Sequence, residues 1–380
     1  MPSWLGCAMP GPRWRPAPTG FAALLRPNGC GPLNNDSDRI DFSTRIAKAA
    51  ETYRRPDWAF MVSHGKTGEK PSGCPSRFFP WCGQLVSRSG WDEDAHWSFF
   101  DAGPWGIAHQ HTDKLHLSLT LGPDDVLVDS GRFAYRGELA RFRREYGVES
   151  FAHNTIVIDH RPQAPGPDEV ESPADNAIDC LITPEFDYLC AVCDHFRDVP
   201  AGQFKHQRTL FYLRGEYWLI LDRVTAPHPV DIQILWHWHP ECQVQHRTGH
   251  IYTANTGRHN LSIASWHQHK LELHTQLVRG VDEGGRLQGW YSPCYNQISA
   301  APVTISQTSA GPDTFILHLL QPSEPGSIVS APPALSWEMD SEAHMLHIDI
   351  VFPESQVRHR VTLPLAAGAS SRPSFQPLSG

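Results

Sequence analysis

The sequence predicts an all-β protein: a large antiparallel β-sandwich of stacked sheets with a short helical segment near the N-terminus. Short runs of apolar or alternating residues recur along most of the chain, and Gly, Pro and Asp bound them as they bound strands. The 33 Pro and 29 Gly supply frequent turns, and only 19% of the residues are charged, which disfavours long surface helices. A chain of 380 residues is long enough to bury a sizeable core.

Residues 1–75 are predicted to be an irregular segment that contains one helix. The first 35 residues are rich in Pro, Gly, Trp and Arg and show neither a helical nor a strand period. Between Asp41 and Tyr53, apolar and small residues recur at helical spacing, and the Arg-Arg-Pro that follows ends this helix. A linker rich in Gly, Pro and Ser occupies residues 63–75.

Residues 76–370 are predicted to form the sandwich. The first group of predicted strands is 99–101, 115–121, 126–129, 155–159, 208–213, 217–224 and 232–239. The second group is 251–254, 261–266, 303–307, 314–320, 345–352 and 358–363. Regular short strands separated by turn signals are typical of a sandwich, and we expect the second group to continue the same stacked sheets. Residues 371–380 are expected to form a disordered tail.

Charge and cysteine content narrow the classes of function. The formal net charge of −9 argues against a nucleic-acid partner, because phosphate-backbone binding needs clustered Lys and Arg. The same charge repels an acidic polysaccharide unless Arg and some of the 22 His form a local cluster. Nine Cys, spread from Cys7 to Cys294, predict mostly free thiols. The first 25 residues lack the apolar core of a signal peptide, and no run is long enough to span a membrane.

The strongest chemical signal is a set of His and Asp residues near the ends of predicted strands. In an extended segment residues two apart face the same way, so His109 and His111 can address one cleft. Asp129 ends the next strand and can lie beside them across a hairpin, and His153 can return along a neighbouring strand. Two imidazoles and one carboxylate form a zinc site with open coordination positions.

Two other interpretations of these residues stay open. The histidines could instead cap turns or donate hydrogen bonds at a polar sheet end, which is the commoner case for any single His. His111 and Asp113, together with His153, also match the two-His-one-carboxylate set of iron oxygenases. That hypothesis predicts that Asp113, rather than Asp129, contacts the metal.

Four blocks of the sequence resemble the heparinase II/III family of polysaccharide lyases, in the family's order. These blocks are Phe99–Pro104, His109–Lys114, Leu127–Arg132 and Ala152–Asp159. Residues 289–293 add weaker support, and residues 34–38 resemble the end of the family's helical toroid. The resemblance implies an α/α-toroid joined to antiparallel β-sheets, and cleavage by β-elimination of uronic-acid-containing glycans such as heparan sulfate or alginate.

The resemblance also implies roles for single residues. It makes His111, Asp129 and His153 the ligands of a metal, either zinc in a structural role or another divalent cation. It turns His109 toward the substrate, where an imidazole can take the C5 proton or neutralise the substrate carboxylate. Tyr146 resembles the sandwich-side tyrosine that some members place at the cleft. Packing of its amphipathic loop on the sheet is an equally good interpretation of Tyr146.

Three arginines near Tyr146 are candidates for substrate binding. Arg132, Arg143 and Arg144 could hold uronate or sulfate groups bidentately, although exposed arginines are more often a solvated face. In the family, a catalytic Tyr and a carboxylate-gripping Asn or His come from the toroid. Because nearly all of that domain is missing from this sequence, we expect a truncated form.

The sequence therefore leaves three hypotheses on the function of the protein. The first is an enzyme, a polysaccharide lyase whose partner is an acidic polysaccharide or oligosaccharide. The second is a non-catalytic, metal-stabilised sandwich that binds acidic glycan, and the third is the iron oxygenase. The resemblance places the protein in the periplasm, whereas the lack of a visible signal peptide favours the cytoplasm.

Overall fold

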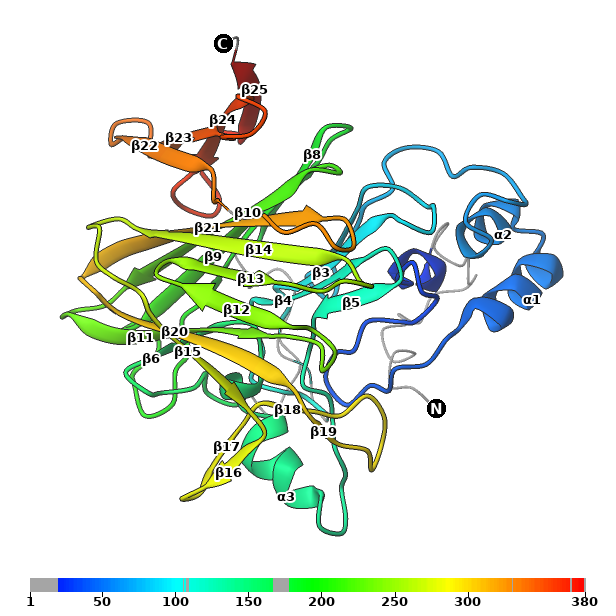
Figure 1. Ribbon diagram of the computed structural model, residues 1–380, viewed down its shortest axis with the longest axis horizontal. Helices are drawn as coiled ribbons and strands as arrows, with labels where there is room; N and C mark the ends of the chain where they lie inside the picture. Colours follow the sequence, from blue (N-terminus) through cyan, green and yellow to red (C-terminus); the bar gives the residue numbers. More distant parts are fainter. Residues whose placement is uncertain are drawn as a thin grey trace.

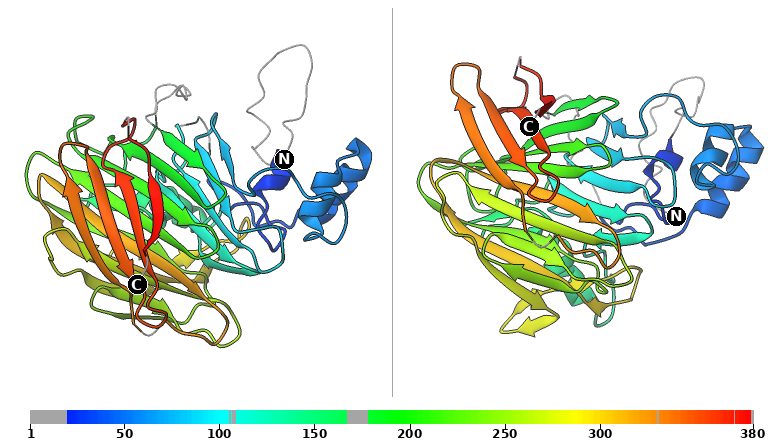
Figure 2. Two further views of the ribbon diagram at one scale, coloured as in Figure 1. Left: turned by 90° about the horizontal axis from the view of Figure 1, so that it is seen from above. Right: turned by 45° about the horizontal axis from the view of Figure 1, so that its top comes forward.

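Three stacked layers of antiparallel β-sheet make up most of the protein, which confirms the all-β prediction (Figure 1). The computed structural model describes residues 20–104, 106, 109–166, 178–329, 331–369 and 371–378. An eight-stranded sheet forms the middle layer. One of its faces packs against a five-stranded and a four-stranded sheet, and its other face packs against a second four-stranded sheet (Figure 2).

The middle sheet is apolar on both faces because layers cover both. In β10 (Tyr217–Thr225), Trp218 and Ile220 face one layer while Leu219 and Leu221 face the other, and all four side chains are fully buried. The strand order is β12-β13-β14-β21-β10-β9-β8-β7. The other strands are β12 (Val244–Arg247), β13 (His250–Thr253), β14 (Asn260–His267), β21 (Asp313–Ser323), β9 (Lys205–Leu213), β8 (Phe186–Cys193) and β7 (Asp179–Ile182).

Two smaller sheets cover one face of the middle sheet, and the loops between their strands hold the predicted metal ligands. The five-stranded sheet consists, in order, of β1 (Arg77–Phe79), β2 (Gln84–Arg88), β3 (His96–Asp101), β4 (His116–Leu121) and β5 (Asp124–Leu127). The four-stranded sheet consists, in order, of β15 (His274–Arg279), β20 (Pro302–Ala310), β11 (Val230–His237) and β6 (Ile156–Ile158). A bridge between Leu127 and Trp238 joins the two sheets.

The outer layer corrects two predictions. It consists of β22 (Ala334–Asp340), β23 (Met345–Val351), β24 (Arg358–Pro364) and β25 (Ser374–Leu378). The strands predicted at 345–352 and 358–363 thus exist, but they form a separate sheet instead of continuing the first ones. The tail predicted to be disordered contains β25, which pairs with β24 and packs Phe375 against the core between the layers. Residues 370, 379 and 380 lie outside the described residues.

Within residues 20–75, the described part of the N-terminal segment, there are two α-helices where the sequence predicted one. The predicted helix is confirmed as α1 (Ser43–Tyr53), and Arg54 ends it in the left-handed conformation with a φ of 51°. The proline that follows also begins α2 (Pro56–Val62), because the first turn of a helix needs no backbone N–H from that position. Both helices lie at one end of the molecule (Figure 1). The prediction for residues 1–19 lies outside the described residues.

Short elements complete the fold. They are the pairs β16 (Val281–Glu283) with β17 (Arg286–Gln288) and β18 (Trp290–Tyr291) with β19 (Ser299–Ala300), the helix α3 (Ala140–Phe142), the π-helical turn Arg143–Gly147, and the 3-10 helices Phe21–Leu24 and Ser150–Ala152.

The eight cysteines that the structure describes are free thiols, as predicted, and Cys7 lies outside the described residues. Within the described ranges, no helix has the length and apolar character needed to cross a membrane.

A buried ion cluster fastens the N-terminal segment to β5. The carboxylate of Asp125 lies 2.8 Å from Arg26 Nη1 and 3.0 Å from Arg39 Nε, and it accepts a hydrogen bond from Asn28 Nδ2 at 3.1 Å. Burial opposes ionisation of Asp125, but the two guanidinium groups hold the pKa of this carboxyl well below its usual range. The cluster thereby fixes the chain on both sides of residues 34–38.

We expect Asp125→Asn to lower the free energy of unfolding by roughly 3–5 kcal/mol at neutral pH, because it leaves the buried guanidinium group of Arg26 without a carboxylate. The folded pKa of Asp125 lies below the unfolded value of about 3.9, so this stabilisation is complete above about pH 4 and is lost as the pH falls further. Urea unfolding of both proteins between about pH 7 and about pH 3 should show their difference narrowing only at the acid end.

The control for this prediction is Glu93→Gln. It removes an ion pair with Lys66 in which both side chains are mostly exposed, so it should leave the free energy of unfolding unchanged. A difference between Asp125→Asn and the unchanged protein that stays constant into the acid range would contradict the assignment of the low pKa.

Candidate metal centre

The three predicted ligands come together where the five-stranded and four-stranded sheets meet. His111 lies in the loop between β3 and β4, and Asp129 follows β5. His153 follows the 3-10 helix Ser150–Ala152 and precedes β6. One ligand atom from each residue lies within 4.8 Å of the others, and all three residues are buried. The structure therefore brings together the residues that the sequence singled out as a group able to hold a metal.

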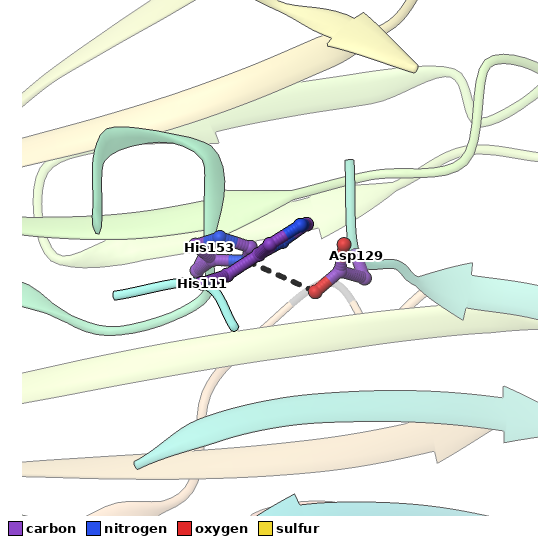
Figure 3. A group of neighbouring side chains, drawn as sticks. All are labelled: His111, Asp129 and His153. Carbon is purple, nitrogen blue, oxygen red and sulfur yellow. Dashed lines mark hydrogen bonds and ion pairs between the residues drawn. The ribbon is translucent and has the colours of Figure 1, made fainter. Parts of the chain in front are cut away.

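The hydrogen bonding of this group fits a bound cation. Figure 3 shows the two imidazole rings side by side with the Asp129 carboxylate facing them. His153 Nδ1 lies 2.9 Å from Asp129 Oδ2, whereas Nε2 of the same ring is buried with no hydrogen-bond partner among the described residues. His111 Nδ1 is buried and unpaired in the same way. Because buried polar atoms rarely stay unpaired, two free imidazole nitrogens beside a carboxylate fit a divalent metal such as zinc.

Burial and charge set the protonation of the three side chains. Burial lowers the pKa of His111, which favours the neutral ring that a metal needs. Burial also disfavours the charged form of His153, but the charge and hydrogen bond of Asp129 outweigh it and raise the pKa of His153. Burial opposes ionisation of Asp129 as well, yet the charge of His153 holds the pKa of Asp129 below its usual range. Asp129 is thus an ionised carboxylate.

A glycine two residues after Asp129 fixes this carboxylate. Gly131 has a φ of +82°, and a Cβ at this position would lie 2.0 Å from the backbone oxygen of Ser292, so only glycine fits. The Gly131 N–H donates a hydrogen bond of 2.8 Å to Asp129 Oδ1. The Asp-Ser-Gly block therefore orients its own aspartate.

Asn154 joins the chain segments around the centre. Its Nδ2 donates to the backbone oxygens of Leu117, at 2.8 Å, and Val128, at 3.1 Å. Its Oδ1 accepts a hydrogen bond of 2.6 Å from the backbone N–H of His237, and its own N–H donates to His116 Nδ1. One buried amide thus holds β4, the residue before Asp129, and β11 at fixed distances.

Asp113 is not a member of the group that could hold a metal. Its side chain is buried, and this burial raises its pKa to about 7, so the carboxylate is only partly ionised near neutral pH. Cations prefer ionised carboxylates. The geometry therefore favours Asp129, and it speaks against the oxygenase set that required Asp113.

His109 lies beside the centre, although not for the reason that the sequence suggested. Instead of belonging to an extended strand, His109 lies in the loop before β4 with a left-handed φ of 59°. The rings of His109 and His111 meet at the carboxylate of Asp36: His109 Nδ1 lies 2.7 Å from Oδ2, and His111 Nε2 lies 3.1 Å from Oδ1. The Asp36 side chain is only 2% exposed, whereas that of His109 is 46% exposed. A buried carboxylate therefore holds an imidazole that is open to solvent.

The predicted substrate-binding arginines have different surroundings. Arg143 binds Asp36 through two hydrogen bonds of 3.1 and 2.8 Å, and Arg132 binds Asp38 in the same way at 2.9 and 2.8 Å. Arg144 is exposed and makes no ion pair with the part of the chain that the structure describes. A substrate anion would therefore have to compete with aspartates for two of these three side chains, and their role stays a prediction.

Tyr146 belongs to the interior. It is fully buried in a cluster with Phe133, Ala152 and Leu287, and burial raises its pKa well above the usual range. This placement favours the packing interpretation that the sequence left open.

A different tyrosine lies at the open side of the centre. The hydroxyl of Tyr135 lies 3.0 Å from His109 Nδ1 and donates to Asp36 Oδ2 at 3.1 Å, and 42% of Tyr135 is exposed. Burial and the charge of Asp36 raise the pKa of Tyr135. Sequence reasoning missed both Tyr135 and Asp36. Residues 34–38 stood out as a motif, but only the tertiary contacts place Asp36 against His111, which lies 75 residues further along the chain.

Comparison with protein families gives one match. A family model described as "Heparinase II/III-like, C-terminal" matches residues 72–337. This range contains His109, His111, Asp129, Tyr135 and His153. A search of curated proteins finds no match.

Solved structures share the fold. The heparan sulfate lyase HepC from Pedobacter heparinus is 18% identical with a TM-score of 0.74, and the alignment covers 90% of this chain and 51% of that chain. The heparinase III BT4657 gene product is 15% identical with a TM-score of 0.70, and the alignment covers 94% of this chain and 51% of that chain. A further structure of heparinase III is 13% identical with a TM-score of 0.72, and the alignment covers 92% of this chain and 54% of that chain. The chain spans about half the length of these proteins.

Proposed function

The chain belongs to the heparinase II/III-like C-terminal family, and on this premise we propose that it acts in the cleavage of uronic-acid-containing glycans by β-elimination. The name of the structurally similar HepC, a heparan sulfate lyase, makes heparan sulfate the first substrate class to test, followed by alginate. One observation carries the proposal: a half-exposed His109 is held by the buried Asp36 beside the hydroxyl of Tyr135.

The reaction needs two proton transfers. A base takes the proton from C5, which is acidic because it lies next to the carboxylate. The C4–O bond then breaks, a C4=C5 double bond forms, and the departing oxygen takes up a proton. Nδ1 of His109 faces Asp36, so the proton on this nitrogen leaves Nε2 with the free electron pair. We assign the C5 proton to His109 Nε2.

Tyr135 is the group we assign to the departing oxygen. Its raised pKa keeps the phenol protonated, so it can act as a donor, and its hydroxyl lies 3.0 Å from the same imidazole. The two groups are therefore close enough to act on neighbouring carbon atoms of one sugar ring. Asp36 orients both, because it contacts the imidazole and the hydroxyl at the same time.

His111, Asp129 and His153 would hold a divalent cation, with zinc as the best match to two imidazoles and one carboxylate. When bound, the ion would supply a fixed positive charge beneath the His111 loop. His111 also contacts Asp36, so the loop that carries the metal ligand and the carboxylate that holds His109 are directly connected. We propose a structural role for the metal.

An absorbance assay tests this function. The protein is mixed with heparan sulfate, alginate, hyaluronan or chondroitin, and the unsaturated product is followed in the near ultraviolet. We expect turnover on at least one polymer, a loss of at least about 100-fold in kcat/KM for His109→Ala, and a loss of about 10-fold or more for Tyr135→Phe. His246→Ala, on the exposed surface of β12, is the matched control and should retain full activity.

Two results would reject the lyase. A flat absorbance trace on all four polymers is the first, and full activity of His109→Ala is the second. Retention of the protein on an immobilised acidic glycan without absorbance would instead support the non-catalytic binding module.

A further inference from the structure

We propose that Arg208, in the core of the sandwich, is a positioning residue that holds the three metal ligands in their binding geometry. This inference rests on the metal centre proposed above. Arg208 lies on β9 in the middle sheet and is fully buried. Its hydrogen bonds go to Asp222 and to two backbone oxygens near the ligands, so its connection to the ligands runs through the backbone.

The contacts of one nitrogen carry the argument. Arg208 Nη1 donates to the backbone oxygen of Leu115 at 2.9 Å and to that of Asn154 at 2.6 Å. Leu115 lies in the turn that leads from His111 into β4, and Asn154 directly follows His153. A single guanidinium nitrogen therefore ties together the segments that carry two of the ligands.

The turn at Leu115 needs such a contact. Leu115 is fully buried and has a φ of +70°, in the left-handed region that is strained for a residue with a Cβ. Its N–H donates to the backbone oxygen of Asp101 at 2.6 Å, and its oxygen accepts from Arg208. Strained backbone persists only where its surroundings hold it at both ends. Without Arg208 the oxygen end of this turn would lose its partner.

Asp129, the third ligand, is connected to Arg208 through Asn154. The Asn154 side chain donates to the backbone oxygen of Val128, directly before Asp129. Arg208 fixes the backbone of Asn154, and Asn154 in turn fixes the segment of Asp129. All three ligand segments are thus connected to one side chain in the core.

Asp222 on β10 sets the direction of the guanidinium. Arg208 Nε and Nη2 donate to its two carboxylate oxygens at 2.7 and 2.9 Å, which leaves Nη1 for the two backbone oxygens. His206 Nε2 lies 2.7 Å and His318 Nε2 lies 3.3 Å from the same carboxylate. Burial opposes ionisation of Asp222, but the charge of Arg208 holds its pKa well below the usual range. Arginine suits this task because its planar group presents several donors at fixed angles, whereas lysine offers a compact ammonium.

Two variants and one control separate positioning from general stability. Arg208→Lys keeps the charge beside Asp222 but cannot reach the carboxylate and both backbone oxygens together. The double variant Arg208→Met with Asp222→Asn removes the buried charges as a pair, a change that often preserves folding. The control is Arg223→Met, which removes an arginine on β10 that binds Asp313 bidentately and donates to the Leu365 oxygen.

Zinc affinity is measured by competition with a chromophoric chelator, and the Co²⁺-loaded proteins are compared by visible absorption. We expect both Arg208 variants to bind zinc about 10- to 100-fold more weakly and to show an altered Co²⁺ spectrum, while Arg223→Met binds within about twofold of the unchanged protein. Affinity within about twofold for either folded Arg208 variant overturns the inference. Loss of folding in both variants overturns it as well, because Arg208 would then serve the fold as a whole.

Amide hydrogen exchange of the metal-free proteins supplies a readout independent of the metal. In Arg208→Lys, exchange should quicken in residues 111–116 and 153–155 and stay unchanged in the outer sheet, β22 to β25. The same change in exchange rate along the whole chain, or no change in residues 111–116 and 153–155, overturns the inference. If the unchanged protein takes up no zinc, the proposed metal centre is rejected, and the exchange pattern still decides whether Arg208 holds these segments.

Discussion

Asp129→Ala should abolish zinc binding, whereas Asp113→Ala should leave the zinc affinity within a few-fold of the unchanged protein. Asp129 is an ionised, buried carboxylate in one group with His111 and His153, while Asp113 lies outside this group and its pKa is raised to about 7. Loss of one of the three protein ligands removes much of the binding free energy of the metal. Equilibrium dialysis followed by metal analysis measures the bound zinc per chain.

The same pair of variants also separates the metal hypotheses. Zinc at 100 times its dissociation constant should stabilise the unchanged protein and Asp113→Ala by about 2.7 kcal/mol, and should leave Asp129→Ala unaffected. Thermal unfolding with and without zinc measures this difference, and circular dichroism before heating shows that each variant is folded. Loss of metal in Asp113→Ala alone would overturn the assignment of Asp129 and revive the iron-oxygenase set.

Asp36→Ala should combine a large loss of stability with a large loss of the proposed activity. The Asp36 carboxylate contacts four side chains, those of His109, His111, Tyr135 and Arg143. Its removal leaves the guanidinium group of Arg143 without its carboxylate partner. We expect the free energy of unfolding to fall by roughly 3–5 kcal/mol. Because His109 and Tyr135 lose their common anchor, kcat on the cleaved polymer should fall by about 100-fold or more, with KM changing less.

The matched control for Asp36 is Asp38→Ala, in the same N-terminal segment. Asp38 pairs with Arg132, and this pair is only partly buried, with the side chains of Asp38 and Arg132 23% and 18% exposed. The expected loss of stability is therefore smaller, about 1 kcal/mol. Urea unfolding measures the stability, and the absorbance assay gives kcat and KM. Equal effects of the two substitutions on kcat would contradict the role of Asp36 in orienting His109.

The strands were largely predictable, but their partners were not. Largely apolar runs bounded by turn residues predicted strands at 208–213 and 217–224, which lie in β9 and β10. The same pattern could not show that β14 pairs with β21, about fifty residues further on, or that β23 and β24 form a layer of their own. Pairing depends on which apolar faces meet in space, and the pattern of residues within a single strand carries no such information.

The sequence by itself, through local motifs that resemble the heparinase II/III family, determined the three candidate ligands His111, Asp129 and His153. The tertiary structure alone decided what surrounds them. It moved Tyr146 into the core and brought Tyr135 to the open side. It also brought Asp36 into contact with His111, which is 75 residues away in the sequence, and Arg208 beside Asn154, which is 54 residues away in the sequence. The physical reason is that burial and hydrogen bonding depend on distances in space. Such distances are fixed only when the three layers and the N-terminal segment pack together.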